Sequence, residues 1–301
     1  MATNDVDPKT LRVAPRGEHS AGSSDRRSGG GKPSTPLHAY VLHRWDWSET
    51  SLIVELFTRE RGRVVVIAKG AKRPTSNFRA VLLPFHPLQA LLGKTPADQS
   101  GEVHALRSAE WAGGVPPLPG ATLFSAFYAS ELVMKLLARD DPHPALFDAY
   151  TATLLALAAG ADEAPVLRAF ELALLRETGV LPHLATDTLS AQPLQAEARY
   201  ALQAQTGLVA SPKGQRGASW LALEDALARN DWHALQAACG EAGTALRVPL
   251  REVLHYHLGP SPLRTRQVWQ GVQRLSQRVL ATPVSSPVPI PAPAHESSDR
   301  P

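Results

Sequence analysis

A Pro-rich segment at residues 115–120 (VPPLPG) divides the chain into two parts with different hydrophobic patterns. Upstream of it, apolar and polar residues alternate over short runs, which is typical of β-strands. Downstream of it, apolar residues return at mixed steps of three and four residues, which is typical of helices. The chain is therefore expected to be an α+β protein, with a β domain at residues 37–115 and a larger all-α domain at residues 116–281.

The β domain contains five strand-like runs. The fourth carries Pro84 and Pro87, which cannot donate hydrogen bonds to a ladder, so this run is expected to be bulged or at an edge. Five short strands, with one long excursion between the third and the fourth, are typical of a small closed or partly open barrel. The strands are expected at residues 37–45, 51–58, 63–69, 81–92 and 102–111.

The C-terminal part contains seven helix-like runs. Gly179 follows the third of them and fits the residue after a helix, where glycine adopts a left-handed backbone without a Cβ penalty. Residues 180–215 show neither period and are expected to be irregular. The helices are expected at residues 121–139, 144–159, 163–177, 220–229, 231–239, 243–258 and 265–280.

Both ends of the chain have compositions that do not build a core. Residues 1–36 contain Gly, Ser and Pro with almost no large apolar side chains, and residues 282–301 are Pro-rich. Such segments bury too little apolar surface to offset the entropy of ordering. We therefore expect a disordered N-terminal arm and a disordered C-terminal tail.

Composition also restricts the class of protein. The single cysteine, Cys239, excludes an intramolecular disulfide and a multi-cysteine zinc site. No apolar run reaches the roughly 18 residues of a membrane-spanning helix, and the N-terminus lacks the apolar core of a secretory signal. A soluble cytoplasmic protein without membrane contact is expected.

The usual signatures of enzymes are missing from the sequence. It contains no Walker A loop, Rossmann glycine pattern, HExxH helix or nucleophile elbow. His255 and His257 would point to different sides of a helix, which is poor geometry for one metal ion. Asp140, Asp141 and His143 fit the end of a helix better than a metal cluster. We expect no catalytic site, no metal and no cofactor.

Positive charge gathers in one window, residues 59–79, on a predicted hairpin turn and the long loop after the third strand. The window holds seven Lys or Arg against Glu60 alone, a formal charge of +6 (seven minus one) in a chain of net charge +3. Cations neutralise phosphates and release counterions, which gives sequence-independent nucleic-acid binding. The candidate DNA-binding cations are Arg59, Arg61, Arg63, Lys69, Lys72, Arg73 and Arg79.

Aromatic residues flank this basic window. Trp45 and Trp47 are candidates for stacking on unpaired bases. Packing at the rim of the barrel is an equally good interpretation for both. A solvated charged face above core aromatics is the alternative to a binding surface, and Phe57 and Phe85 are expected to face the core.

The order of these features resembles the RecO family of bacterial recombination mediators, over roughly residues 37–280. Residues 39–73 (AYVLHRWDWSETSLIVELFTRERGRVVVIAKGAKR) are similar to the family's first three strands and its K-G-(A/V)-(K/R) loop, and FRAVLLPFHPL follows as in the family. LRAFELALLRETGVLPHL resembles a family signature helix, and LREVLHYHLGPSPLRTRQVW resembles its closing helices. Three such segments in the right order identify the chain as similar to RecO proteins.

The resemblance implies an N-terminal OB-fold barrel, a helical C-terminal domain and a role in DNA repair without catalysis. RecO proteins bind single- and double-stranded DNA, anneal complementary strands, and contact the C-terminal tail of single-stranded-DNA-binding protein. With RecR they help to load RecA, which fits a cytoplasmic protein associated with the nucleoid. The alternative function is an RNA-binding OB-fold adaptor, although the ordered aromatic array that is usual in RNA modules is not visible.

A binding site for the acidic protein tail is implied in the helical domain. The tail ends in a hydrophobic residue with a free carboxylate, so its receptor needs an apolar pocket beside a cation. Arg168, close to Phe170, matches a basic position that the family uses for this contact. The alternative role of Arg168 is an i,i+3 ion pair with Glu171. Weaker candidates for the tail or for DNA are Arg264 and Arg266.

One departure from the family concerns zinc. Many RecO proteins carry a four-cysteine zinc site in the region that matches residues 182–215, where this chain has His183 and no cysteine. The segment is therefore expected to be held by packing and hydrogen bonds.

Overall fold

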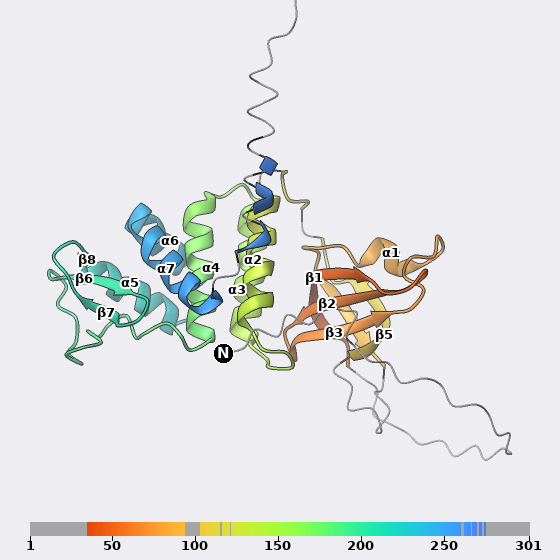
Figure 1. Ribbon diagram of the computed structural model, residues 1–301, viewed down its shortest axis with the longest axis horizontal. Helices are drawn as coiled ribbons and strands as arrows, with labels where there is room; N and C mark the ends of the chain where they lie inside the picture. The colour runs from red at the N-terminus through yellow and green to blue at the C-terminus, as the bar shows by residue number, and fades with distance from the viewer. Residues whose placement is uncertain are drawn as a thin grey trace, which may run out of the picture.

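The computed structural model describes residues 35–93, 103–114, 116–120, 122–259, 262–265, 267–269, 271–272 and 274. The arm and the tail that are expected to be disordered lie outside these residues, apart from Thr35 and Pro36. The described part forms a β-barrel followed by a helical domain (Figure 1), which confirms the predicted fold class.

The barrel has the strand order of an OB fold, a five-stranded Greek-key barrel. Its strands close in the order β1-β2-β3-β5-β4, with β3 parallel to β5 and the other neighbours antiparallel. Alternate residues of a strand face one side, so Val54, Leu56, Val64 and Val66 fill the interior. The strands are β1 (Leu37–Asp46), β2 (Leu52–Thr58), β3 (Gly62–Ala68), β4 (Leu88–Leu92) and β5 (Val103–Trp111).

The fourth predicted strand is wrong in its first half. Residues 77–81 form a short helix, α1 (Asn77–Val81), and the ladder of β4 begins only at Leu88. Pro84 and Pro87 supply no backbone N–H to a ladder, and Phe85 between them has a positive φ of 67°. The chain therefore turns across the barrel before it enters the sheet.

The helical domain confirms six predicted helices, with boundaries that differ from the prediction by a few residues. Helix α4 (Glu163–Glu177) begins and ends at the predicted residues. Its start is fixed by Asp162, which caps the N-terminus by accepting from the N–H of Ala164. Described residues between 264 and 274 are also helical. No described helix is long and apolar enough to cross a bilayer. The other helices are α2 (Leu123–Leu136), α3 (Pro144–Ala158), α5 (Gly217–Ala228), α6 (Trp232–Ala242) and α7 (Arg247–Leu258).

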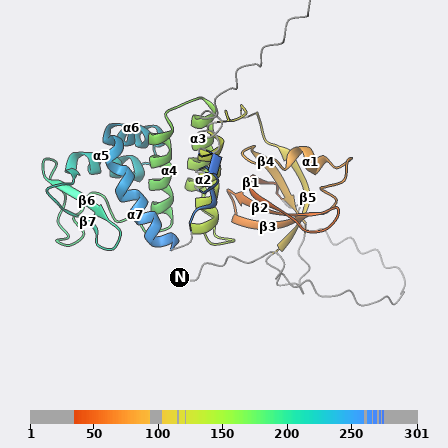
Figure 2. The same ribbon diagram turned by 45° about the horizontal axis from the view of Figure 1, so that its top comes forward.

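Residues 180–215 are not irregular throughout, as predicted, but contain a small sheet at the far end of the helical domain (Figure 2). Strands β6 (Arg199–Gln203), β7 (Gly207–Ala210) and β8 (Gln215–Arg216) pair in the order β7-β6-β8. The strands have two to five residues, so their alternation is too short to stand out. A signal was present in the sequence, because the large apolar residues Tyr200 and Leu202 are two positions apart shortly before Gly207, and both are buried.

The hydrogen bonds expected in this region centre on Asp187. Its Oδ1 accepts from the N–H groups of Leu189 (3.0 Å) and Ser190 (2.9 Å), and its Oδ2 accepts from that of Ala210 (2.9 Å). These hydrogen bonds stabilise the ionised carboxylate and lower the pKa of Asp187, and the bond from the N–H of Ser190 has the largest effect. No group of three or more His, Cys, Asp or Glu side chains with metal-binding geometry occurs among the described residues. The carboxylate of Asp187 thus organises this loop.

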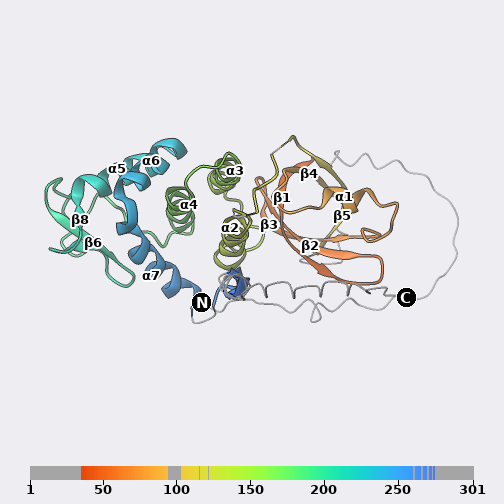
Figure 3. The ribbon, with the colours of Figure 1, turned by 90° about the horizontal axis from the view of Figure 1, so that it is seen from above.

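The barrel and the helical domain share one hydrophobic core. Tyr40 of β1 and Phe57 of β2 lie on the outer face of the barrel and pack against Phe147 and Tyr150 of α3, with ring centroids 5.2–5.8 Å apart. Figure 3 shows α2 and α3 lying alongside this face. One side of the barrel is therefore covered, and the loops at its opposite end remain available for binding.

Candidate nucleic-acid interface

Strand β3 divides the predicted basic window into two groups. Arg59, Arg61 and Arg63 lie at the β2–β3 turn, and the other four cations follow the end of β3. A strand rises about 3.3 Å per residue, so the seven residues of β3 place the two groups on the order of 20 Å apart. We call them the turn group and the loop group.

The turn group is engaged by the helical domain, although the side chains of Arg59 and Arg61 remain 46% and 39% exposed. Arg59 forms two hydrogen bonds to the carboxylate of Asp148 on α3, at 3.0 and 2.9 Å. Arg61 donates to Asp140 at 2.6 Å. Burial, and then the charge of Arg61, lower the pKa of the neighbouring His104. These contacts bind the barrel to α3 and to the loop that precedes it.

Arg63 is the most buried member of the turn group, at 8% exposure. Its Nε donates to Glu55 at 2.9 Å and its Nη1 donates to the carbonyl of Leu137. Arg139 also contacts Glu55, at 3.3 Å. The guanidinium of Arg63 is thus neutralised inside the domain junction, and the three arginines of the turn group serve the contact between the barrel and the helical domain.

The loop group lies at the end of the barrel away from α3. Lys69, Arg73 and Arg79 are exposed, whereas Lys72 lies 3.2 Å from the carboxylate of Asp46. Backbone hydrogen bonds fix the loop, since the N–H of Arg73 donates to the carbonyl of Gly70 at 3.0 Å. Lys69 and Arg73 therefore project from an ordered loop, and Arg79 projects from α1.

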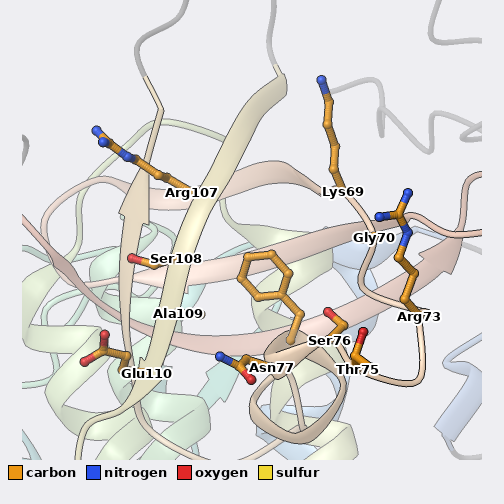
Figure 4. A pocket seen from close by; sticks show the side chains of 11 residues that line it. Lys69, Gly70, Arg73, Thr75, Ser76, Asn77, Arg107, Ser108, Ala109 and Glu110 are labelled. Atoms are coloured by element: carbon orange, nitrogen blue, oxygen red, sulfur yellow. The ribbon is translucent and has the colours of Figure 1, made fainter.

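A pocket of about 450 Å³ opens between this loop and strand β5. Arg107 of β5 forms part of one wall, and Lys69 and Arg73 form the other (Figure 4). With Glu110 as the one acidic lining residue, the formal charge of the lining is +2, three cations minus one carboxylate. The remaining lining residues are Gly70, Thr75, Ser76, Asn77, Phe78, Ser108 and Ala109.

Arg107 is the residue that reasoning from the sequence missed. It lies 28 positions beyond the end of the basic window, and the parallel pairing of β3 with β5 brings it to the loop. The available signal was an isolated cation in a predicted strand.

The two candidate tryptophans do not line this pocket. Trp45 is half-buried near the end of β1 and meets His43 edge-on, with ring centroids 4.5 Å apart. Trp47, also half-buried, lies in the β1–β2 loop, where its N–H donates to the carbonyl of Ser51.

The predicted tail-binding residues are only partly brought together. Phe170 is fully buried, because α4 is packed between α3 and α6. The side chain of Arg168 is 17% exposed and forms the alternative i,i+3 pair, at 2.8 Å from Glu171. Arg264 is exposed, and its N–H donates to Glu131 on α2 at 2.7 Å. Arg266 lies outside the described residues.

Glu171 is the most unusual carboxylate in the helical domain. It is fully buried, and one oxygen receives both Arg168 and the hydroxyl of Tyr128, the latter at 2.7 Å. The other oxygen has no hydrogen-bond partner among the described residues. Burial raises the pKa of Glu171 to about 7, although Arg168 and Tyr128 oppose the shift.

Comparison with known proteins agrees with this architecture. The family model "Recombination protein O N terminal" matches residues 35–114, and "Recombination protein O C terminal" matches residues 120–267. The DNA repair protein RecO of Variovorax paradoxus (strain S110) is 48% identical over 253 residues, covering 79% of this chain and 96% of that protein. The DNA repair proteins RecO of Polaromonas sp. (strain JS666) and Delftia acidovorans are 47% and 49% identical with the same coverage. The chain therefore belongs to the RecO family of DNA repair proteins.

Proposed function

We propose that this protein is a non-catalytic mediator of DNA repair that binds single- and double-stranded DNA through the loop end of its barrel. The observation that carries the proposal is the cationic pocket. Lys69, Arg73 and Arg107 line it, and none forms an ion pair within the described part of the chain. Unlike the charges of the turn group, theirs are not already paired with carboxylates.

Annealing of complementary strands follows from the same electrostatics. Two strands repel each other through their phosphates, and a surface that neutralises them lowers this repulsion without reading the sequence. Backbone hydrogen bonds hold the loop that carries Lys69 and Arg73, such as that from the N–H of Arg73 to the carbonyl of Gly70, so the surface is preformed. No step of this mechanism requires a nucleophile, a metal or a cofactor.

The helical domain supplies the proposed contacts to other proteins. We assign to it the acidic tail of single-stranded-DNA-binding protein, and to the whole protein a complex with RecR that helps to load RecA. Arg264 supports the tail contact because Val268 and Trp269, one helical turn later, are exposed apolar side chains. Arg168 is a second candidate for the tail contact, because 17% of its side-chain surface is exposed. These activities place the protein in the cytoplasm, at the nucleoid.

An RNA-binding adaptor is the less favoured function. Family membership links the chain to DNA repair. Single-stranded RNA modules stack several bases on an ordered set of strand aromatics. Among the described residues that line the pocket, Phe78 is the one aromatic side chain.

Annealing assays test the proposal with two variants. Replacement of Lys69, Arg73 and Arg107 by alanine should slow annealing of bare strands roughly tenfold or more, because three phosphate contacts are lost. Arg264→Ala should leave annealing of bare strands at the wild-type rate and slow that of strands coated with single-stranded-DNA-binding protein. Wild-type annealing by the folded triple variant would show that DNA binds elsewhere.

A further inference from the structure

The pocket at the loop end of the barrel has two chemically different ends. Figure 4 shows Lys69 and Arg107 at one end, and Glu110 and Asn77 at the other. Arg107 and Glu110 are three residues apart on one strand, so their backbones are separated by about 10 Å. A ligand that fills the pocket therefore meets cations at one end and a carboxylate with an amide at the other.

A β-bulge places these two side chains on the same side of β5. Leu92 pairs with Leu106 and Leu91 pairs with Ser108, so Arg107 is an extra residue without a partner in the ladder. The buried residues Leu106 and Ala109 are consequently three positions apart instead of two. Bulges re-aim side chains in this way next to binding sites. Without the bulge, Arg107 and Glu110 would face opposite sides of the sheet.

The cationic end suits a phosphate and the acidic end does not. Lys69, Arg73 and Arg107 present only hydrogen-bond donors, as a phosphate requires. The ionised carboxylate of Glu110 presents only acceptors and repels an anion. Its complement on DNA is a hydrogen-bond donor. The exocyclic amino group of cytosine, adenine and guanine supplies one, whereas the one donor of an unpaired thymine, N3–H, lies between two carbonyl oxygens that repel a carboxylate.

The size and lining of the pocket fit one nucleotide. Its volume of about 450 Å³ lies within the range of roughly 300–1,000 Å³ that is usual for small-ligand sites. Phe78 offers an aromatic face for stacking, and Asn77 offers both a donor and an acceptor. A base that is still paired in a duplex keeps its edge and faces covered, so only an unpaired base can enter.

We propose that this pocket binds one unpaired nucleotide of single-stranded DNA, with its phosphate at Lys69, Arg73 and Arg107 and its base toward Glu110. Glu110 then favours a base that carries an exocyclic amino group over thymine. This inference rests on the proposed binding of DNA by the loop end of the barrel. It adds a preference for base type to a surface that otherwise recognises charge.

Fluorescence anisotropy with labelled oligomers of equal length tests this preference on the full chain. Oligo-dC should bind about three- to tenfold more tightly than oligo-dT, the effect of one hydrogen bond to a charged group in an open site. Oligo-dU, which lacks the methyl group, should bind like oligo-dT. Glu110→Gln should raise the affinity for dT and dU and bring the ratio of affinities close to one, because an amide both accepts and donates.

Glu49→Gln is the matched control. It removes the same charge from an exposed carboxylate in the β1–β2 loop, outside the pocket lining, and should preserve the ratio of dC to dT affinity. Equal binding of dC and dT by the wild type, or a ratio that Glu110→Gln leaves unchanged, would overturn the inference while the DNA-binding proposal stands. Failure of every oligomer to bind would overturn both.

Discussion

Gly62→Ala is expected to destabilise the protein strongly and to separate the barrel from the helical domain. Gly62 has a φ of +68°, and a Cβ there would lie 1.8 Å from the carbonyl oxygen of Asp141. The strained backbone alone costs about 1–3 kcal/mol, and a clash between two backbones is not relieved by a side-chain rotation. We expect the melting temperature to fall by more than about 6 °C, as followed by circular dichroism.

Gly160→Ala separates the two causes of this loss. Gly160 has a similar φ of +76°, but nothing lies within 4 Å of the position that a Cβ would take. It should therefore show the cost of the backbone conformation without the clash. Equal losses of stability in the two variants would mean that Gly62 is not pressed against the helical domain as the structure shows.

Arg168→Ala is expected to cost about 3–5 kcal/mol of stability at pH 8, because it leaves the buried Glu171 carboxylate without its cation. The loss should be smaller at pH 6. The folded-state pKa of Glu171 is already raised from 4.5 to about 7, so the native state takes up a proton in this window. Protonation of Glu171 in the folded state stabilises the protein. This stabilisation is fully present below the unfolded-state pKa of 4.5 and is lost as the pH rises through the folded-state pKa of about 7.

Two variants distinguish this buried pair from an ordinary surface contact. Arg229→Ala breaks an exposed intrahelical pair with Asp225 and should cost only about 0.3–0.5 kcal/mol. Glu171→Gln in the Arg168→Ala background should restore most of the lost stability, because no buried charge remains. A double variant as unstable as Arg168→Ala would contradict the burial of Glu171. The restored protein also allows the proposed tail contact of Arg168 to be measured separately from its role in the fold.

The alternation of side chains predicted most of the barrel because its two faces have different surroundings. Strand β2 carries polar Glu55 between Val54 and Leu56, whereas β3 is a continuous apolar run in which Val65 is also buried. The start of the fourth strand was misplaced because residues 81–87 are apolar enough for a strand, but Pro84 and Pro87 lack the N–H groups that a ladder needs. Helices were predicted more closely, since Asp162 marks the start of α4 and left-handed Gly179 its end.

The sequence predicted the positive charge of the candidate site but not which residues form it. Clustered charge indicated a binding surface for anions, yet sequence separation does not show which end of β3 each cation occupies. Acceptors from distant segments, Asp148 and the carbonyl of Leu137, engage Arg59 and Arg63. Arg107 reaches the loop through strand pairing and a bulge, and neither is visible in a local window.

The most direct test of DNA binding at the loop end is the salt dependence of affinity for single-stranded DNA in two matched double variants. Lys69→Ala with Arg73→Ala and Arg59→Ala with Arg61→Ala each remove two cations from the same window. Each phosphate contact contributes about −0.7 to the slope of log affinity against log salt concentration. The loop-end variant should be less steep by about 1.4, and the turn variant should keep the wild-type slope. An unchanged slope in the loop-end variant, with a flattened slope in the turn variant, would contradict this assignment of the DNA-binding surface.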